Sequence, residues 1–302
     1  MNPSEFTMER LARDVLNRFP GPRSTLRNLL GRTRLAPFVR EITSLETVLE
    51  NYPEFRRRVL GLGGRGPFRA LLRGGATIEF PLRRGPALIY SNLPLMLREV
   101  WRDAIYNPEG FELHKTDTVV DIGANVGVFS VYAAARATSG RILAYEPVPV
   151  LYNLLAENFR LNHIRNANPV QMGVLDHEGE GFIWCDPKNL GGHSMFRGRV
   201  TAAKLERIPI QVTTLDGIFR SHHLDRIDFL KVDCEGSEYR ILEAANDHTI
   251  QRIGRISLEY HLFPELESGP LALSRRLKGQ GFKVTTRATD EGTGMLWARQ
   301  SN

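Results

Sequence analysis

The chain has 302 residues, a net charge of +6 and a hydrophobic content of 42%, enough to form one large core or two unequal ones. No apolar run approaches the roughly 20 residues of a membrane span, and residues 1–13 lack the apolar centre of a secretory signal. The two cysteines, Cys185 and Cys234, lack metal-ligand spacing, so we expect a reduced, cytoplasmic setting.

The positive charge is concentrated toward the N-terminus. Residues 1–84 hold 16 arginines and no lysine against 8 acidic residues. Such a region could bind nucleic acid, anionic lipid or an acidic glycan. Alternatively, its arginines could pair with the chain's own acidic residues or stay solvated. Peripheral membrane contact therefore stays open. Aromatic and basic residues are not interleaved as in RNA-recognition motifs, which speaks against a nucleic-acid partner.

The pattern of the first 75 residues predicts a mainly helical, Arg-rich region. Apolar spacing predicts helices over 6–19, 23–30 and 45–59. A glycine-rich break at 61–66 follows, and we place a domain boundary near residue 75, between regions 1–75 and 76–302. Beyond it, the pattern predicts a hairpin of strands 77–82 and 87–90 and a helix over 95–106.

From residue 117 onward, strands and helices alternate as a parallel doubly wound sheet requires. Strands are predicted at 117–122, 141–145, 168–174, 227–232 and 256–260. Helices are predicted at 127–137, 149–161, from Ser237 and at 271–278. Two extra strands, 181–184 and 208–213, flank a polar loop at 186–198. A C-terminal antiparallel hairpin of 282–286 and 295–298 favours the methyltransferase variant of this α/β, Rossmann-like fold.

A tight glycine turn follows the strand at 117–122. Gly123 and Gly127 would let a ligand lie against the backbone, beside the N–H groups of the next helix. Asn125 stands where a dinucleotide fingerprint has its second glycine, which argues against a pyrophosphate. Asp121 suits a cation instead, and S-adenosylmethionine carries an amino group and a sulfonium centre. The turn therefore predicts an S-adenosylmethionine site.

The next strand ends in Glu146-Pro147. An acidic side chain about 20 residues past the glycine turn binds a ribose diol in such folds. We therefore assign Glu146 and Pro147 to the cofactor site. The other interpretation is a structural turn with a surface glutamate.

A cluster of charged residues lies at the end of the strand predicted at 227–232 and just after it. Unpaired charge is costly to bury, so Lys231, Asp233, Glu235 and Glu238 should sit at the carboxyl edge of the sheet, beside the glycine turn. Alternation sends Lys231 and Asp233 to the same side of the strand. Asp233 is the best candidate for the reaction centre, with Lys231 and Glu235 at the edge of the active site. Glu238 is predicted to cap the following helix.

Methyl transfer requires an aligned acceptor oxygen and a group that takes its proton. Besides Asp233, the candidate bases are His193, in the polar loop, and Glu259 and His261, at the end of the strand at 256–260. A lone histidine is more often structural. A divalent metal could bridge Asp233 and Glu235, but no spacing demands one and we assign no metal ligand.

Five segments together resemble the FkbM family of S-adenosylmethionine-dependent methyltransferases: DIGANVGVFS at 121–130, YEPVP at 145–149, LLAENFRLN at 154–162, TLD at 214–216 and KVDCEGSEYRIL at 231–242. The resemblance spans about 97–298 and leaves 1–75 outside. It implies a class I methyltransferase fold, S-adenosylmethionine as cofactor, and O-methylation of a sugar, glycolipid, polysaccharide or secondary metabolite. The family pattern covers Asp121, Gly123, Asn125, Gly127, Glu146, Pro147, Lys231, Asp233, Glu235, Gly236 and Glu238.

Two functions of other classes stay open. The basic N-terminal region suggests a nucleic-acid methyltransferase, although the chain lacks the Asn-Pro-Pro-Tyr or Asp-Pro-Pro-Tyr motif of attack on a base amine. The other is a non-catalytic cofactor-binding module. Such a module should lose the charged edge at 231–238, which this chain retains.

Overall fold

The computed structural model describes residues 42–59, 66–80, 93–186, 189–194, 206–262, 269–290 and 292–301. The chain divides into two compact units, Met1–Asp103 and Ala104–Asn302. The boundary predicted near residue 75 therefore falls inside the first unit. The helices predicted at 6–19 and 23–30 and the strand at 87–90 lie outside the described residues. Within the described part, no helix is long and apolar enough to cross a membrane.

The first unit contains an antiparallel hairpin of β1 (Phe68–Leu71) and β2 (Thr77–Phe80). One edge of β2 pairs with β1, and the partner strand predicted at 87–90 lies outside the described residues. Gly74 and Gly75 make this turn because both take positive φ angles, 105° and 93°.

The helix predicted at 45–59 is interrupted. A short 3₁₀-helix, η1 (Leu45–Thr47), is separated from α4 (Tyr52–Val59) by a turn. In that turn, the side chain of Asn51 donates to the carbonyl of Arg69 at 2.7 Å and accepts from the N–H of Leu71 at 2.9 Å. These bonds tie the chain to β1 and compete with a continuous helix. Further on, α5 (Leu93–Leu97) runs into η3 (Arg98–Arg102), so the helix predicted at 95–106 ends at Arg102.

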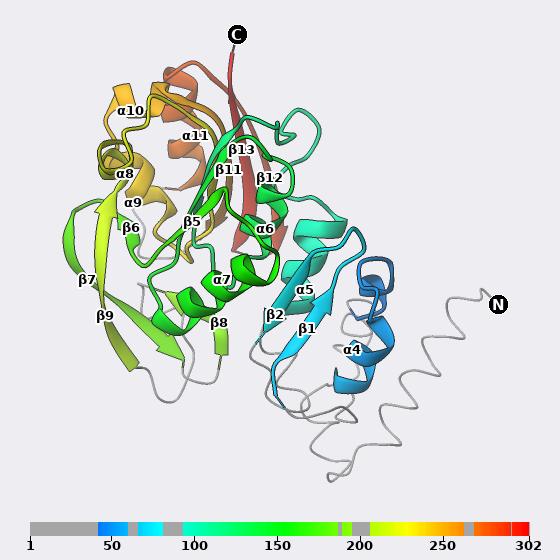
Figure 1. Ribbon diagram of the computed structural model, residues 1–302. Helices are drawn as coiled ribbons and strands as arrows, with labels where there is room; N and C mark the ends of the chain where they lie inside the picture. The colour runs from blue at the N-terminus through cyan, green and yellow to red at the C-terminus, as the bar shows by residue number, and fades with distance from the viewer. Residues whose placement is uncertain are drawn as a thin grey trace. The chain divides into compact units, whose positions relative to one another are not determined.

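In the second unit, seven strands form one sheet in the order β12-β13-β11-β10-β3-β4-β5 (Figure 1). They are β3 (Thr118–Ile122), β4 (Arg141–Tyr145), β5 (Ala167–Val170), β10 (Ile227–Val232), β11 (Ile253–His261), β12 (Phe282–Asp290) and β13 (Thr293–Gln300). Neighbouring strands are parallel except that β13 is antiparallel to both β11 and β12. The doubly wound sheet with a C-terminal antiparallel hairpin is confirmed.

Helices cover both faces of this sheet. Residues 119–122 of β3 and 229–232 of β10 are all buried, as central parallel strands require. The apolar side chains of one face, including Val120 and Leu230, pack against α8 (Leu215–Ser221), α9 (Glu238–Ala244), α10 (Asp247–Gln251) and α11 (Pro270–Gly279). On the opposite face, α6 (Val128–Ala134) lies over Asp121, while α7 (Pro149–Leu161) follows β4.

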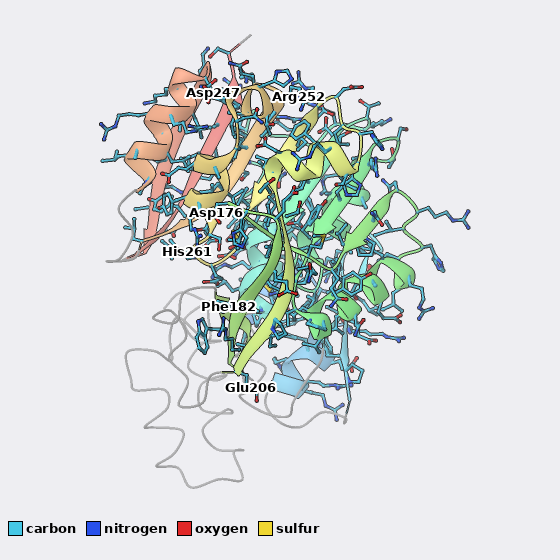
Figure 2. All side chains as sticks on the ribbon, turned by 90° about the vertical axis from the view of Figure 1, so that its left-hand side faces the viewer. Asp176, Phe182, Glu206, Asp247, Arg252 and His261 are labelled. Atoms are coloured by element: carbon cyan, nitrogen blue, oxygen red, sulfur yellow. The ribbon has the colours of Figure 1, made fainter. Side chains whose placement is uncertain are left out.

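A smaller sheet has the order β6-β9-β7-β8 and consists of β6 (Gly173–Leu175), β7 (Gly179–Asp186), β8 (Asn189–Ser194) and β9 (Glu206–Thr214). The single strand predicted at 168–174 is wrong, because β9 pairs with residues 173–175 and draws them into this second sheet. The loop predicted at 186–198 contains β8. Figures 1 and 2 show β7 and β9 projecting from the main sheet, where the guanidinium of Arg207 lies 3.5 Å above the ring of Phe182.

The strand order creates a switch point between β3 and β10. From β3 the chain builds outward through β4 and β5, and from β10 it builds outward through β11 in the other direction. The segments that leave β3, β4, β10 and β11 therefore meet at one carboxyl edge, where open α/β sheets bind their ligands.

Candidate active site

The glycine turn after β3 is shaped by its neighbours. The N–H groups of Gly123 and Ala124 both donate to the carbonyl of Tyr145, at 3.1 and 2.9 Å. Gly123 has a φ of +77°, and a Cβ there would lie 1.8 Å from the carbonyl oxygen of Asp233. A Cβ on Gly127, at φ +91°, would lie 2.6 Å from Leu155 Cδ1. Both glycines are therefore required by close packing within the protein, a reason that differs from the ligand access that the sequence suggested.

Glu146 is buried beneath this turn. One carboxylate oxygen accepts from the N–H of Asn125 at 2.9 Å and the other from the N–H of Val148 at 2.8 Å. Burial raises the pKa of Glu146 to about 7, against these two bonds that lower it. Each oxygen keeps a second lone pair, so the carboxylate can accept further hydrogen bonds. Pro147 lies half-buried between Glu146 and Val148.

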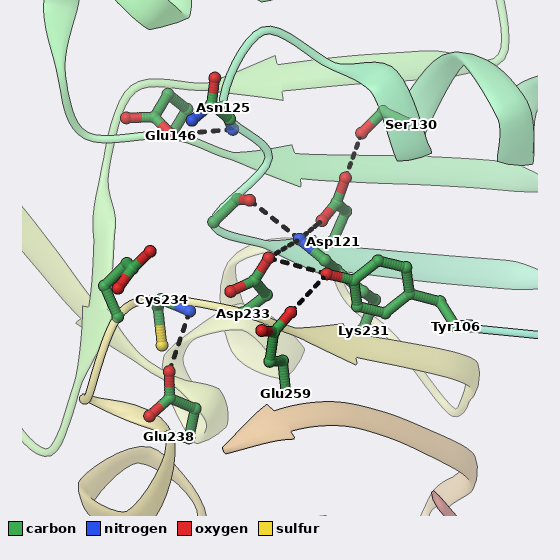
Figure 3. Close-up of polar contacts among 12 residues, drawn as sticks. Tyr106, Asp121, Asn125, Ser130, Glu146, Lys231, Asp233, Cys234, Glu238 and Glu259 are labelled. Atoms are coloured by element: carbon green, nitrogen blue, oxygen red, sulfur yellow. Dashed lines mark hydrogen bonds and ion pairs between the residues drawn. The ribbon is translucent and has the colours of Figure 1, made fainter. Parts of the chain in front are cut away.

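Asp121 and Lys231 form a buried ion pair. They are register partners on β3 and β10, and Lys231 Nζ lies 3.1 Å from Asp121 Oδ1. Ser130 Oγ donates to the other oxygen of Asp121 at 2.6 Å, and Lys231 also donates to the carbonyl of Gly123 at 2.9 Å (Figure 3). Burial lowers the pKa of Lys231, but the charges of Asp121 and Asp233 outweigh it and raise the pKa. Asp121 is fully buried, and the cation beside it in this structure is Lys231.

Asp233 and Glu259 are joined by a tyrosine from outside the sheet. The hydroxyl of Tyr106 lies 2.9 Å from Asp233 Oδ2 and 3.0 Å from Glu259 Oε2 (Figure 3). Burial raises the pKa of Glu259 to about 7, and the charge of Asp233 adds to this effect. A hydroxyl has one hydrogen, so both contacts are true hydrogen bonds when one of the two carboxyl groups is protonated. The arrangement can therefore hold and pass a proton near neutral pH.

Tyr106 was missed by sequence reasoning. It lies 127 residues from Asp233 and 153 from Glu259, so no local spacing connects them. The residue before Tyr106 is held by Trp297, whose Nε1 donates to the carbonyl of Ile105 at 2.9 Å. The Tyr106 ring meets Phe129 edge to face, with ring centres 5.6 Å apart. These contacts fix the hydroxyl between the two carboxyl groups.

The loop after β10 is held by Glu238, the first residue of α9. Its Oε1 accepts from the N–H groups of Cys234 and Gly236, at 3.1 and 2.9 Å. Both residues precede the helix, so Glu238 holds the loop and does not cap α9 as predicted. His261 Nδ1 lies 3.0 Å from the same oxygen. Glu235 has a left-handed φ of 54°, and one of its oxygens lies 3.6 Å from His261 Nε2.

His261 is buried among three acidic side chains, those of Glu235, Glu238 and Glu259. Burial lowers its pKa, but the hydrogen bond to Glu238 and the charges around it outweigh burial and raise the pKa to about 9. An imidazole that already holds its proton cannot accept one from a substrate. In this structure His261 is the partner of Glu238, and its role as a base stays a prediction.

The remaining predictions concern His193 and a metal ion. The backbone of His193 lies in β8, paired with β7, and its side chain is outside the described part of the structure, so its role stays a prediction. Among the described residues, no group of three or more His, Cys, Asp or Glu side chains is arranged to hold a metal ion.

This chain matches a family and several relatives that are methyltransferases by name. The family described as Methyltransferase FkbM domain matches residues 121–284. Methyltransferase sdnD of Sordaria araneosa is 26% identical over 220 residues, which cover 62% of this chain and 81% of that protein. The 31-O-demethyl-FK506 methyltransferase FkbM of Streptomyces tacrolimicus is 28% identical over 215 residues, 63% of this chain and 81% of that protein.

Solved structures align with this chain at low identity. M. jannaschii TYW2 in complex with AdoMet is 13% identical and has a TM-score of 0.41, over 78% of this chain and 85% of that one. The matched segment of the family begins at Asp121 and extends through the Lys231 to Glu238 edge and Glu259. It spans more than half of the sequence, and the chain belongs to the FkbM family of S-adenosylmethionine-dependent methyltransferases.

Proposed function

We propose that this protein transfers the methyl group of S-adenosylmethionine to a hydroxyl oxygen of a sugar, glycolipid, polysaccharide or secondary metabolite. The observation that carries the proposal is the chain of hydrogen bonds from Asp233 through Tyr106 to Glu259 at the carboxyl edge of the sheet. A similar protein is a 31-O-demethyl-FK506 methyltransferase by name, which supports oxygen as the methylated atom.

The cofactor would lie along the turn after β3, with its ribose toward Glu146. The lone pairs left on the Glu146 oxygens suit the two hydroxyls of a ribose. Gly123, Asn125 and Gly127 set the path of the turn, and Pro147 follows Glu146 at its border. The sulfonium of the cofactor supplies an activated methyl group, so the protein has to align the acceptor and remove its proton.

Asp233 is the group that takes this proton in the proposal. Its Oδ2 is bound to Tyr106 and lies 3.6 Å from Lys231 Nζ, while Oδ1 has no hydrogen-bond partner among the described residues. Its side chain is 27% exposed, so an acceptor hydroxyl can reach Oδ1. When the protonated carboxyl group of Asp233 carries its hydrogen on Oδ2, it can give that hydrogen to the Tyr106 oxygen as the Tyr106 hydroxyl gives its own hydrogen to an ionised Glu259. Asp233 is then ionised again and Glu259 is protonated, while Lys231 keeps Asp233 oriented.

The charge of the site favours an uncharged acceptor rich in hydroxyls. Asp233, Glu235 and Glu259 are all partly exposed, at 27%, 25% and 21%. Together they would repel an acceptor that is itself anionic at the reacting end, whereas carboxylates accept hydrogen bonds from sugar hydroxyls readily. This supports a neutral sugar or polyhydroxylated metabolite over a nucleic acid backbone.

Labelled methyl transfer tests the proposal. Purified protein with methyl-labelled S-adenosylmethionine is incubated with neutral glycans, glycolipids, hydroxylated metabolites and tRNA, and products are identified by mass spectrometry. We expect a base-stable methyl ether on a glycan or metabolite, with its formation lost in Asp233→Asn. Labelling of tRNA alone would replace the proposal with a nucleic-acid methyltransferase. Cofactor binding without transfer to any acceptor class would favour a cofactor-binding module.

A further inference from the structure

A second cavity lies at the amino edge of the seven-stranded sheet, across the sheet from the candidate active site. Its volume is about 460 Å³, within the range of small-molecule sites. The walls come from the segments that begin β3, β10, β11 and β12 and from the end of β13, near the C-terminus in Figure 1. Its charged lining residues are Asp117, Arg226, Asp228, Arg255, Lys283 and Arg299.

Three of the cations form a row across adjacent strands. Arg255 on β11 is the register partner of Arg299 on β13, and Arg299 is the register partner of Lys283 on β12. Register partners point to the same face of a sheet with Cβ atoms roughly 5 Å apart, and like charges in this arrangement are destabilising. A row of this kind costs stability unless anions stand beside it.

The protein's own acids neutralise only part of this charge. Asp117 is bound to Arg255 at 2.7 Å, and Asp228 is bound to Arg226 at 3.0 Å. Both acids also accept backbone N–H groups, from His114 and Thr118, so each is already paired within the protein. The side chains of Lys283 and Arg299 form no hydrogen bond or ion pair with any described residue. The cavity therefore keeps two adjacent positive charges.

We propose that this cavity binds a small molecule carrying a phosphate group, with Arg299 and Lys283 as the side chains that contact it. Two unpaired cations match the double charge of a phosphate, and a guanidinium presents paired donors that fit its oxygens. The concave shape favours a small molecule over an extended polyanion. The proposal is independent of the proposed methyl acceptor.

The phosphate site would be separate from the reaction centre. Arg255 and Glu259 lie on the same face of β11, four residues apart, which corresponds to roughly 13 Å along a strand. The cavity and the candidate active site therefore lie at opposite edges of the sheet.

Calorimetry with inorganic phosphate at low ionic strength tests the proposal. The test variant is Lys283→Gln with Arg299→Gln. The matched control is Arg275→Gln with Lys278→Gln, which removes two exposed cations from α11 outside the cavity. We expect saturable binding to wild type and to the control, at least about tenfold weaker binding to the test variant, and weaker binding of acetate than of phosphate.

Two further measurements make the result decisive. In phosphate-free buffer, the test variant should melt at the same temperature as wild type or higher, because the repulsion in the row is gone, and it should bind S-adenosylmethionine normally. Added phosphate should then raise the melting temperature of wild type and control more than that of the test variant. The proposal is overturned by the absence of saturable phosphate binding below about 10 mM, or by equal weakening in both double variants. Failure of S-adenosylmethionine binding alone would count against the proposed function and leave the phosphate site standing.

Discussion

The phenolic oxygen of Tyr106 and Oε2 of Glu259 lie 3.0 Å apart, although 153 residues separate them in the chain. The same phenolic oxygen lies 2.9 Å from Asp233. This relationship couples the protonation of two carboxyl groups through one hydroxyl, because its single hydrogen cannot serve both contacts at once. Four predictions follow from this site and its surroundings.

Tyr106→Phe should remove the coupling and keep the packing. The ring contact with Phe129 is retained, while Asp233 and Glu259 lose their shared partner. We expect turnover to fall roughly tenfold to a hundredfold, toward the lower range for loss of an acid–base group, with cofactor affinity unchanged. The pH profile of turnover, read against wild type, should also shift, which a purely structural residue would not cause.

The matched control for this change is Tyr132→Phe. Tyr132 lies nearby and its hydroxyl accepts from Asn107 at 2.7 Å, but it contacts neither Asp233 nor Glu259 in the hydrogen bonds of the described residues. Equal loss of turnover in both tyrosine variants would show that the bridging position has no special role.

Asp233→Asn should lower turnover by about 100-fold or more, because the amide keeps the shape of the side chain but cannot take a proton at neutral pH. Steady-state kinetics with the identified acceptor measures the loss, and calorimetry checks that S-adenosylmethionine still binds. Near-normal turnover would transfer the role to Glu259 or His193. Those residues should then be replaced one at a time.

Glu146→Ala should weaken S-adenosylmethionine binding by about tenfold or more, the effect of losing a charge-assisted hydrogen bond of roughly 1.5–3 kcal/mol. The same change leaves the N–H groups of Asn125 and Val148 without their acceptor. Glu146→Gln restores part of this support and separates the two effects. Calorimetry measures the affinity of both variants for S-adenosylmethionine, and their melting temperatures check that they are folded. Wild-type affinity in Glu146→Ala would show that the ribose assignment is wrong.

His261 should make the protein less stable as the pH rises above neutral. Its folded pKa of about 9 lies above the ordinary value of 6.5. The stabilisation is therefore fully present below about pH 6.5 and is lost as the pH rises through about 9. A shift of this size corresponds to about 3 kcal/mol as an order of magnitude.

Urea denaturation of wild type and His261→Gln at several pH values between about 6 and 9 measures this effect. The raised pKa of Glu146 also reduces stability as the pH rises through about 7, but His261 is not among its causes, so this effect cancels in the comparison. The pKa of Glu259 is lowered by the charge of His261, so the difference between the two proteins includes the response of Glu259 to the loss of that charge. His248→Gln, a change at an exposed histidine on α10, is the control. A wild-type curve parallel to that of His261→Gln would contradict the buried ion pair.

The sequence by itself determined the positions of those active-site residues that directly follow, or end, a strand with a recognisable pattern. Each of β3, β4 and β10 ends in a charged or glycine-containing segment, and parallel strands linked by helices bring such ends to one edge. For this reason the positions of Gly123, Glu146, Lys231 and Asp233 followed from strand prediction and chain order. Alternation along β10 likewise placed Lys231 and Asp233 on one side.

Only the tertiary structure decided which side chains meet across elements. Strand register brought Lys231 to Asp121 and lined up Arg255, Arg299 and Lys283, and a segment before the sheet brought Tyr106 to Asp233. Patterns in a sequence report the period of a single helix or strand, whereas these contacts depend on how distant segments are aligned and packed. The space around Gly123 is a further case, because it is filled by a carbonyl that lies 110 residues further along the chain, at Asp233.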